Sequence, residues 1–462
     1  MDDTAFLSAL ELAGLVAAGD VSPAELVEAY LERIERLDPE LCAYVTVRAE
    51  EARAEARAAA PDDPGPFHGV PIALKDLDST AGTRTTFGSR AFAANVPHFD
   101  MAHVRRLKAA GFIVLGKTTT PEFGTTAFTE SELTGATRNP WDTSRTVGGS
   151  SGGAGAALAA GLTPIAQGSD GGGSIRIPAS CCGVFGLKPS RGRISNAPFG
   201  PGIGLSTSGP LTRTVADAAA YLDVVAGYEW GDPWSLPPPE RPFAEAAASN
   251  PERLRIALTT VPLGEAEVHA DCRAAAEDAA ALLAALGHDV EEAAPDWGGS
   301  GLAEDFRPLW QVAPTLYGVE DLSLLTPLNR ALAEAAGQTS SADYVAALVR
   351  VQMLARRVVA FWEGYDLLLT PTLAMPPVPI GWAAEVDDPW EQYERAARFT
   401  PFTPVFNVTG QPAASLPLHW SENGLPIGVQ LVGPPGGEEL LLRVCAQLEA
   451  ARPWADRRPP VS

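Results

Sequence analysis

The chain has 462 residues, of which 46% are hydrophobic, and it carries 57 acidic against 34 basic side chains. Its length allows one large α/β domain or two or three smaller ones. The formal net charge of −23 argues against a nucleic-acid-binding surface, because such surfaces are positively charged. The acidic balance otherwise indicates solubility and carries no information about the fold.

No targeting or membrane-spanning segment is expected. The chain begins Met1-Asp2-Asp3, without the basic start and apolar core of a signal peptide, and no run of about 18 apolar residues occurs in it. Its five cysteines and six histidines lack the spacing of metal ligands, which favours free thiols in a reducing compartment. We therefore expect a cytoplasmic protein with no metal and no cofactor.

The first sixty residues are predicted to be mainly helical. Ser22-Pro23-Ala24-Glu25 forms a capping box with proline at the first helical position. A segment rich in Ala, Arg and Glu predicts another helix over 49–60. A loop over 61–66 then leads into an apolar strand that ends at Lys75.

Helices and strands alternate through the rest of the chain. Helices are predicted at 101–110, 154–162, 271–286 and 438–450, and strands at 112–116, 254–260, 288–292, 365–369 and 428–433. Only the proline-rich stretch 231–251 interrupts the pattern. This alternation predicts an α/β fold with a largely parallel or mixed sheet.

Two serines lie in glycine-rich runs, Gly-Gly-Ser-Ser-Gly-Gly at 148–153 and Gly-Gly-Gly-Ser at 171–174. Glycine lets the backbone approach a substrate closely and aim several N–H groups at one point. A serine beside such a run can attack a carbonyl carbon while those N–H groups hold the oxyanion. The glycines do not form a phosphate loop, because no Lys-Ser/Thr pair follows them. The Gly-x-Ser-x-Gly pattern of a nucleophile elbow does not match the residues around Ser174. It matches those around Ser150, but the strand that precedes such an elbow is not expected there.

Lysine is the predicted base. The chain has four lysines, Lys75, Lys108, Lys117 and Lys188, beside thirty arginines. Lysine can lose its proton whereas arginine cannot, so a lysine at the end of an apolar strand is a candidate for chemistry. Composition alone equally allows a strand-end lysine that reaches solvent. No histidine lies within sixty residues of Ser174, which disfavours a Ser-His-Asp triad.

From Gly148 to Pro178 the sequence resembles the amidase signature enzymes without a break. Further matching segments are 70–76, 115–118, 139–141, 182–189, 368–372 and 407–412, so the resemblance covers nearly the whole chain. It implies a mixed central sheet flanked on both faces by helices, in a single large domain over 1–462. Its parts would be an N-terminal helical region (1–60), a catalytic core (61–230), an inserted α/β region (252–360) and a C-terminal part of the core (361–462).

The resemblance also implies a catalytic triad. Ser174 matches the nucleophile, Ser150 matches a bridging serine that follows a cis peptide bond, and Lys75 matches the base. Lysine accepts a proton only when it is neutral, so its pKa must fall from about 10.4 toward about 7–8. The oxyanion would be held by the backbone N–H groups of Gly171, Gly172, Gly173 and Ser174. Supporting roles are expected for Ser151, Asp170 and Arg176.

This set implies hydrolysis of a carboxylic amide C–N bond through an acyl-enzyme. The Asp-Gly-Gly-Gly-Ser run and the segments after it look most like the bacterial subgroup that includes the 6-aminohexanoate-cyclic-dimer hydrolases. Linear or cyclic aminohexanoate-type amides and aryl or alkyl amides are therefore candidate substrates. We expect a small-molecule amide as the partner, with neither nucleic acid nor membrane. The oligomeric state stays open, with a homodimer as one option.

Two alternatives are kept. The amidase subunit of a tRNA-dependent amidotransferase usually carries an aspartate that holds the ammonium group of glutamine, and by eye that position falls on Ser206 here. A non-catalytic binding protein is disfavoured by the intact set of Lys75, Ser150 and Ser174.

The pocket walls are expected from the segments after 118–123, from 300–330 and from 399–406. These segments contain aromatic side chains that suggest an apolar or aromatic acyl site, although core packing explains them equally well: Phe306, Trp310, Tyr317 and Phe402.

Overall fold

The computed structural model describes residues 4–59, 65–199, 204–297 and 301–462. The described helices are α1 (Ala9–Ala18), α2 (Pro23–Leu41), α3 (Ala49–Ala58), α4 (Ala102–Ala109), α5 (Gly152–Ala159), α6 (Arg176–Cys182), α7 (Val215–Val225), α8 (Phe243–Ala247), α9 (Ala270–Ala285), α10 (Gly301–Trp310), α11 (Pro327–Gln338), α12 (Ser341–Ala360), α13 (Pro389–Phe399), α14 (Val405–Thr409) and α15 (Glu438–Ala451). The strands of the main sheet are β1 (Tyr44–Val47), β2 (Pro71–Lys75), β3 (Ile113–Thr118), β8 (Ile165–Asp170), β9 (Phe185–Lys188), β10 (Thr207–Thr212), β11 (Arg255–Leu258), β12 (Asp289–Glu292), β13 (Leu367–Pro371), β14 (Ala413–Trp420) and β15 (Pro426–Val432). Two small ribbons pair β4 (Glu130–Ser131) with β5 (Gly135–Ala136) and β6 (Arg138–Asn139) with β7 (Asp142–Thr146).

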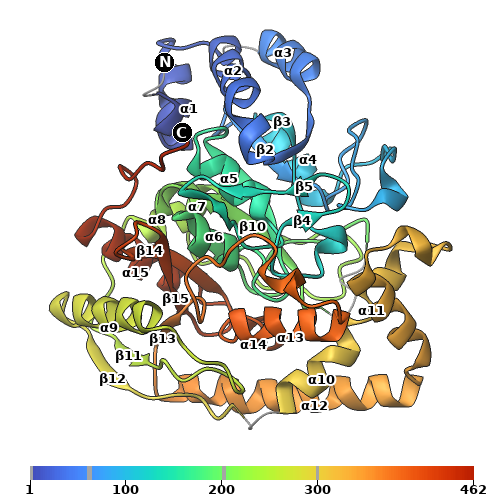
Figure 1. Ribbon diagram of the computed structural model, residues 1–462. Helices are drawn as coiled ribbons and strands as arrows, with labels where there is room; N and C mark the ends of the chain where they lie inside the picture. The colour runs from blue at the N-terminus through green and yellow to red at the C-terminus, as the bar shows by residue number, and fades with distance from the viewer. Residues whose placement is uncertain (1–3, 60–64, 200–203, 298–300) are drawn as a thin grey trace.

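The described strands build one sheet of eleven, in the order β1-β3-β2-β8-β10-β9-β14-β15-β13-β11-β12. Helices pack around this sheet (Figure 1). The strand pairs β2–β3, β2–β8, β11–β12 and β11–β13 are parallel, and the others are antiparallel. The predicted α/β fold with a mixed central sheet is therefore confirmed.

Local signals in the sequence found most of these elements. Helix α2 begins at Pro23, and its N-cap Ser22 exchanges hydrogen bonds with Glu25 as the capping box predicts. The apolar strand that ends at Lys75 is β2. The proline-rich stretch 231–251 was expected only to interrupt the pattern, but it contains the short helix α8. Most of the loop expected at 61–66 lies outside the described residues.

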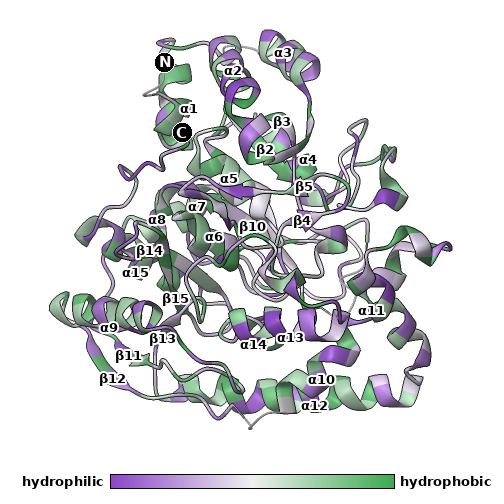
Figure 2. Cartoon of the chain, in the orientation of Figure 1, coloured by the Kyte–Doolittle hydropathy of each residue, from purple (hydrophilic) through white to green (hydrophobic). Residues whose placement is uncertain are grey.

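Helices α5 and α6, which pack against the sheet, are mainly hydrophobic, whereas the outer helices α2 and α3 contain hydrophilic and hydrophobic residues side by side (Figure 2). None of the described helices combines the length and the apolar character that a bilayer span requires.

Helix α5 lies unusually close to the sheet because of its small residues. All eight of its residues are buried. A Cβ on Gly153 would lie 2.5 Å from the carbonyl oxygen of Ala43 and still closer to Thr119, whose backbone leads out of β3. Real Cβ atoms do not approach a backbone oxygen so closely, so this position requires glycine.

We expect Gly153→Ala to destabilise the fold by about 1–3 kcal/mol, because overpacking forces the helix away from the sheet. Gly14→Ala in α1 is the matched control. A Cβ there meets nothing within 4 Å, so the better helix former should stabilise by up to about 1 kcal/mol. The midpoint of thermal unfolding, followed by circular dichroism, checks both. An unchanged midpoint for Gly153→Ala would contradict the close packing of α5.

Candidate active site

Lys75 lies at the carboxyl end of β2, in the middle of the parallel part of the sheet. Strands β3 and β8 flank β2, and every residue of β2 is buried. The Lys75 N–H donates to Gln167 Oε1 at 3.0 Å, which fixes the end of the strand against β8. The side chain is 0% exposed. The alternative of a strand-end lysine in solvent is therefore wrong.

The Lys75 amine lies within hydrogen-bond distance of two serine hydroxyls. Its Nζ donates to Ser150 Oγ at 2.8 Å and to Ser169 Oγ at 3.1 Å. Burial lowers the pKa of Lys75 to about 7, although the carboxylates of Asp78 and Asp170 act in the opposite direction. A substantial fraction of such an amine is uncharged at neutral pH and can accept a proton.

The two glycine-rich runs meet beside this amine. The Gly149–Ser150 peptide bond is cis, as the resemblance implies. The N–H of Ser151 donates to the carbonyl oxygen of Ser174 at 3.1 Å, which joins the loop before α5 to the loop before α6. Lys75, Ser150 and Ser174 therefore come together from three separate segments. Their side chains are almost completely buried, with Ser174 the most exposed of the three at 7%.

A buried ion pair shapes the loop that carries Ser174. Asp170 and Arg176 are both fully buried, and the Arg176 guanidinium donates to both carboxylate oxygens, at 2.8 and 2.9 Å. Burial alone would raise the pKa of Asp170, but the guanidinium holds it well below its usual range. The same carboxylate accepts the N–H of Gly173 at 2.8 Å. The loop is thus tied to the end of β8.

Three N–H groups in this loop remain available for an oxyanion. The sequence predicts four donors, but the N–H of Gly173 already has Asp170 as its acceptor. Within the part of the chain that the structure describes, no hydrogen bond engages the N–H groups of Gly171, Gly172 and Ser174. An oxyanion formed next to Ser174 would supply an acceptor for these groups.

Several residues that position the side chains of the site could not be recognised from the sequence. Gln167 and Ser169 contact Lys75, and they lie two residues apart on β8, so the alternation of a strand could have placed them on one face. Ser151, for which a supporting role was expected, donates from its Oγ to the carbonyl oxygen of Ser169 at 3.2 Å. Thr403 Oγ1 donates to the carbonyl oxygen of Gly172 at 2.8 Å, and this contact over more than 200 residues left no local signal.

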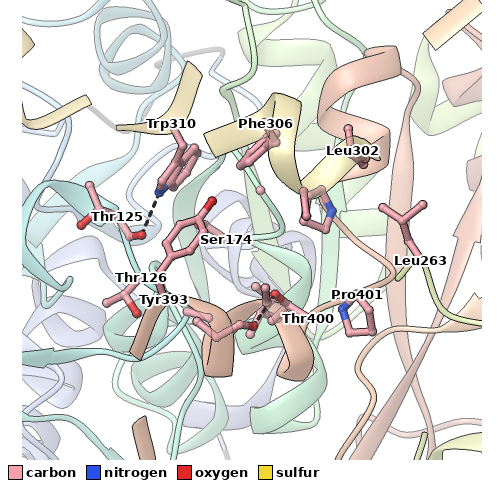
Figure 3. Close-up of a pocket in the computed structure, with 18 of the residues that line it drawn as sticks. Thr125, Thr126, Ser174, Leu263, Leu302, Phe306, Trp310, Tyr393, Thr400 and Pro401 are labelled. Carbon is pink, nitrogen blue, oxygen red and sulfur yellow. Dashed lines mark hydrogen bonds between the residues drawn. The ribbon is translucent and has the colours of Figure 1, made fainter. Parts of the chain in front are cut away.

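A pocket with a cavity volume of about 150 Å³ opens beside Ser174 (Figure 3). Phe306 and Trp310 line it, as the sequence suggested. Tyr317 does not line it, because its ring stacks on Phe123 at 4.1 Å in a separate aromatic cluster. Phe402 also faces the core, at 3% exposure. Leu302 and Pro404 also line it and lie in the expected segments 300–330 and 399–406, whereas Leu263 and Tyr393 come from segments that the sequence did not reveal.

Buried polar contacts attach the pocket wall to the loop after β3. Glu122 Oε2 accepts the N–H of Thr326 at 2.8 Å, at the N-terminus of α11, and the Nδ2 amide of Asn329 at 2.8 Å. Trp310 Nε1 donates to the carbonyl oxygen of Thr125 at 3.0 Å. Helices α10 and α11 are therefore fixed next to the segment that contacts Ser150.

Known proteins match this chain over nearly its whole length. A family model described as Amidase matches residues 25–442. A 6-aminohexanoate-cyclic-dimer hydrolase of Pseudomonas sp. (strain NK87) is 42% identical over 97% of this chain and 95% of its own length. An acylamidase of Rhodococcus erythropolis is 36% identical over 98% of this chain and 97% of its own. A solved structure of 6-aminohexanoate cyclic dimer hydrolase is 40% identical, with a TM-score of 0.94 and 99% of both chains covered.

The depressed pKa predicts that Lys75 destabilises the fold below about pH 10. An unfolded lysine binds its proton below its ordinary pKa of 10.5, whereas folded Lys75 binds it only below about 7. Protonation therefore favours the unfolded chain increasingly as the pH falls through this window. The resulting loss in the free energy of unfolding reaches its full size below pH 7, where it is on the order of 4–5 kcal/mol.

Lys75→Met should accordingly raise the thermal midpoint, and the gain should be larger at pH 6 than at pH 10. Leu74→Met, the neighbouring position in β2, changes no titratable group and should give a difference that is independent of pH. Equal gains for Lys75→Met at both pH values would contradict a depressed pKa.

Proposed function

The chain belongs to the amidase family, and from this premise we propose that it hydrolyses the C–N bond of carboxylic amides with Ser174 as the nucleophile. Enzymes of this family act on amide bonds, and the partner is a small-molecule amide. The observation that carries the catalytic assignment is the 2.8 Å contact between Lys75 Nζ and Ser150 Oγ in a buried site.

In the proposed acylation step, Ser174 Oγ attacks the carbonyl carbon of the amide. Ser150 Oγ accepts the proton of Ser174 and passes its own proton to the neutral amine of Lys75. The developing oxyanion is held by the N–H groups of Gly171, Gly172 and Ser174. The negative charge thus forms where donors are already in place, which lowers the barrier without reorganisation of solvent.

The proton then returns through Ser150 to the nitrogen of the leaving amine, and the C–N bond breaks. This leaves the acyl group as an ester on Ser174 Oγ. Water takes the place of the amine, gives up its proton through the same relay and attacks the ester. The carboxylic acid leaves, and Ser174 and Lys75 return to their starting states.

The proposed substrate classes are linear or cyclic aminohexanoate-type amides and aryl or alkyl amides. They are supported by the named activities of the relatives from Pseudomonas and Rhodococcus. The amidotransferase alternative has less support. At the position where a carboxylate would hold the ammonium of glutamine the chain has Ser206, whose Cβ lies 3.6 Å from where a Cβ on Gly171 would be. The cytoplasmic location and the homodimer stay predictions from the sequence.

Ser174→Ala and Lys75→Ala should each lower amide hydrolysis by at least about a thousandfold, because each removes a member of a unit that acts together. Ser151→Ala is the comparison variant, since its hydroxyl contacts the backbone of Ser169 rather than Lys75, and it should lose less than about tenfold.

Release of amine from simple amides by the purified chain, without tRNA or partner subunits, is the assay, and circular dichroism controls for folding. Undiminished turnover by Ser174→Ala would overturn the assignment of the nucleophile. A chain that works only with partner subunits would favour the transferase alternative.

The pH dependence of kcat/KM tests the role of Lys75 separately. The base must be neutral, so the rate should rise with pH through an apparent pKa of about 7 and then level off. The Asp78 carboxylate raises the pKa of Lys75, so Asp78→Asn should move this rise to lower pH. A rate that is flat between pH 5 and 9 would contradict a lysine base.

A further inference from the structure

The pocket beside Ser174 is lined by apolar side chains and a few hydroxyl groups. Of the described residues that form its wall, none has a charged side chain. An ionised group that moved into this space would lose its hydration and meet no opposite charge. The pocket is therefore built for a neutral group.

One side of this pocket is aromatic. Phe306 and Trp310 of α10 stack with ring centroids 5.4 Å apart and planes inclined by 23°. The hydrogen bond from Trp310 Nε1 to the carbonyl oxygen of Thr125, 3.0 Å long, fixes the indole in its plane. Figure 3 shows both rings among the side chains that surround the pocket. Such a fixed pair offers a surface on which a further flat ring can stack.

The indole of Trp310 also borders the backbone that precedes Ser174. A Cβ on Gly171 would lie 3.4 Å from Trp310 Cζ3, and a Cβ on Gly172 would lie 3.8 Å from its Cη2. The indole therefore lies against the backbone whose N–H groups would hold the oxyanion, with room for no more than a methyl group between it and Gly171. A group bonded to the reacting carbonyl would come against this indole.

The size of the pocket and the hydroxyl group of Tyr393 restrict the chemical class of the ligand further. A cavity volume of about 150 Å³ is close to that of an apolar cavity of about 150 Å³ in another protein that accepts benzene. Tyr393 extends from α13 into the lining, and no described residue hydrogen-bonds to its hydroxyl. That hydroxyl is free to pair with a polar substituent of the ligand.

We propose that this pocket binds an uncharged aryl group of one ring, attached to the scissile amide and packed against Trp310. A polar substituent on that ring would pair with the Tyr393 hydroxyl. The inference rests on the proposed function, because it names the substrate class of the same site. It narrows the substrate classes proposed above: aryl amides are favoured, and amides that would place an ammonium or a carboxylate in this pocket, such as a linear aminohexanoate-type amide bound by its free terminus, are excluded.

The test measures binding rather than turnover, with the Ser174→Ala protein and isothermal titration calorimetry. The ligands are phenylacetamide, hexanamide, 6-aminohexanamide and the monoamide of adipic acid. Phenylacetamide should bind at least about tenfold more tightly than hexanamide. The cationic and anionic amides should bind at least about a hundredfold more weakly than hexanamide, because their charges find no partner.

Two variants identify the surface responsible. Trp310→Leu should abolish the preference for phenylacetamide over hexanamide. Gly171→Ala places a methyl group against the indole without altering α10. It should weaken the binding of phenylacetamide at least about fivefold. Tyr393→Phe removes the hydroxyl and keeps the ring: it should weaken the binding of 4-hydroxyphenylacetamide by about fivefold or more relative to that of phenylacetamide, since only the first of these two ligands offers a hydroxyl to pair.

Charged amides that bind as tightly as hexanamide would overturn the proposal. So would an aryl preference that survives in both Trp310→Leu and Gly171→Ala, or a failure of all four amides to bind at millimolar concentration. Binding in the expected order without hydrolysis by the parent enzyme would instead overturn the proposed function. The two failures are therefore distinguishable.

Discussion

The hydrogen bond between Lys75 Nζ and Ser150 Oγ, 2.8 Å long, exists in a place that water does not reach. Burial disfavours the ammonium form, while the carboxylates of Asp78 and Asp170 favour it, and the balance leaves the pKa of Lys75 at about 7. Both effects come from the parallel strands β2 and β8, which end at the same edge of the sheet. The sheet therefore supplies the basicity of this amine as well as its position.

Three of the four lysines of this chain share burial rather than a chemical role. Lys75, Lys117 and Lys188 are all essentially inaccessible, and burial lowers their pKa values to about 7, 8 and 7. Lys117 donates to the carbonyl oxygen of Asp78 and so holds the loop after β2, and Lys188 donates to the carbonyl oxygen of Pro189. Arg176, which cannot release its proton, instead fixes the loop that carries Ser174 through Asp170. The scarcity of lysine thus indicated that these side chains are buried. Only the position of Lys75 in the fold, next to Ser150, distinguishes it from the other two.

The secondary-structure elements and the glycine-rich segments of the candidate site could be predicted because their signals are local. The capping box of α2, the apolar strand β2 and the glycine-rich runs each lie within a few residues of sequence. The pocket could be predicted only in part: Phe306 and Trp310 lie in an expected segment, but Leu263 and Tyr393 come from segments far away in the chain that carry no local signal. Side-chain type alone did not separate rings that line the cavity, such as Phe306, from rings that fill the core, such as Phe402. That distinction depends on which face of each segment meets its neighbour.

The segment from Glu122 to Thr125 connects the two halves of the site. On one side, Glu122 and Thr125 bind the N-terminus of α11 and the indole of Trp310. On the other, a Cβ on Gly124 would lie 2.9 Å from Ser150 Oγ, so the backbone itself packs against this serine. The pocket wall and the proposed proton relay are therefore positioned relative to the same four residues. Trp310 takes part in this connection, whereas other pocket-facing side chains, such as Phe306 of α10 and Tyr393 of α13, do not. Changes at those positions can therefore vary substrate choice while Lys75 and Ser150 keep their geometry.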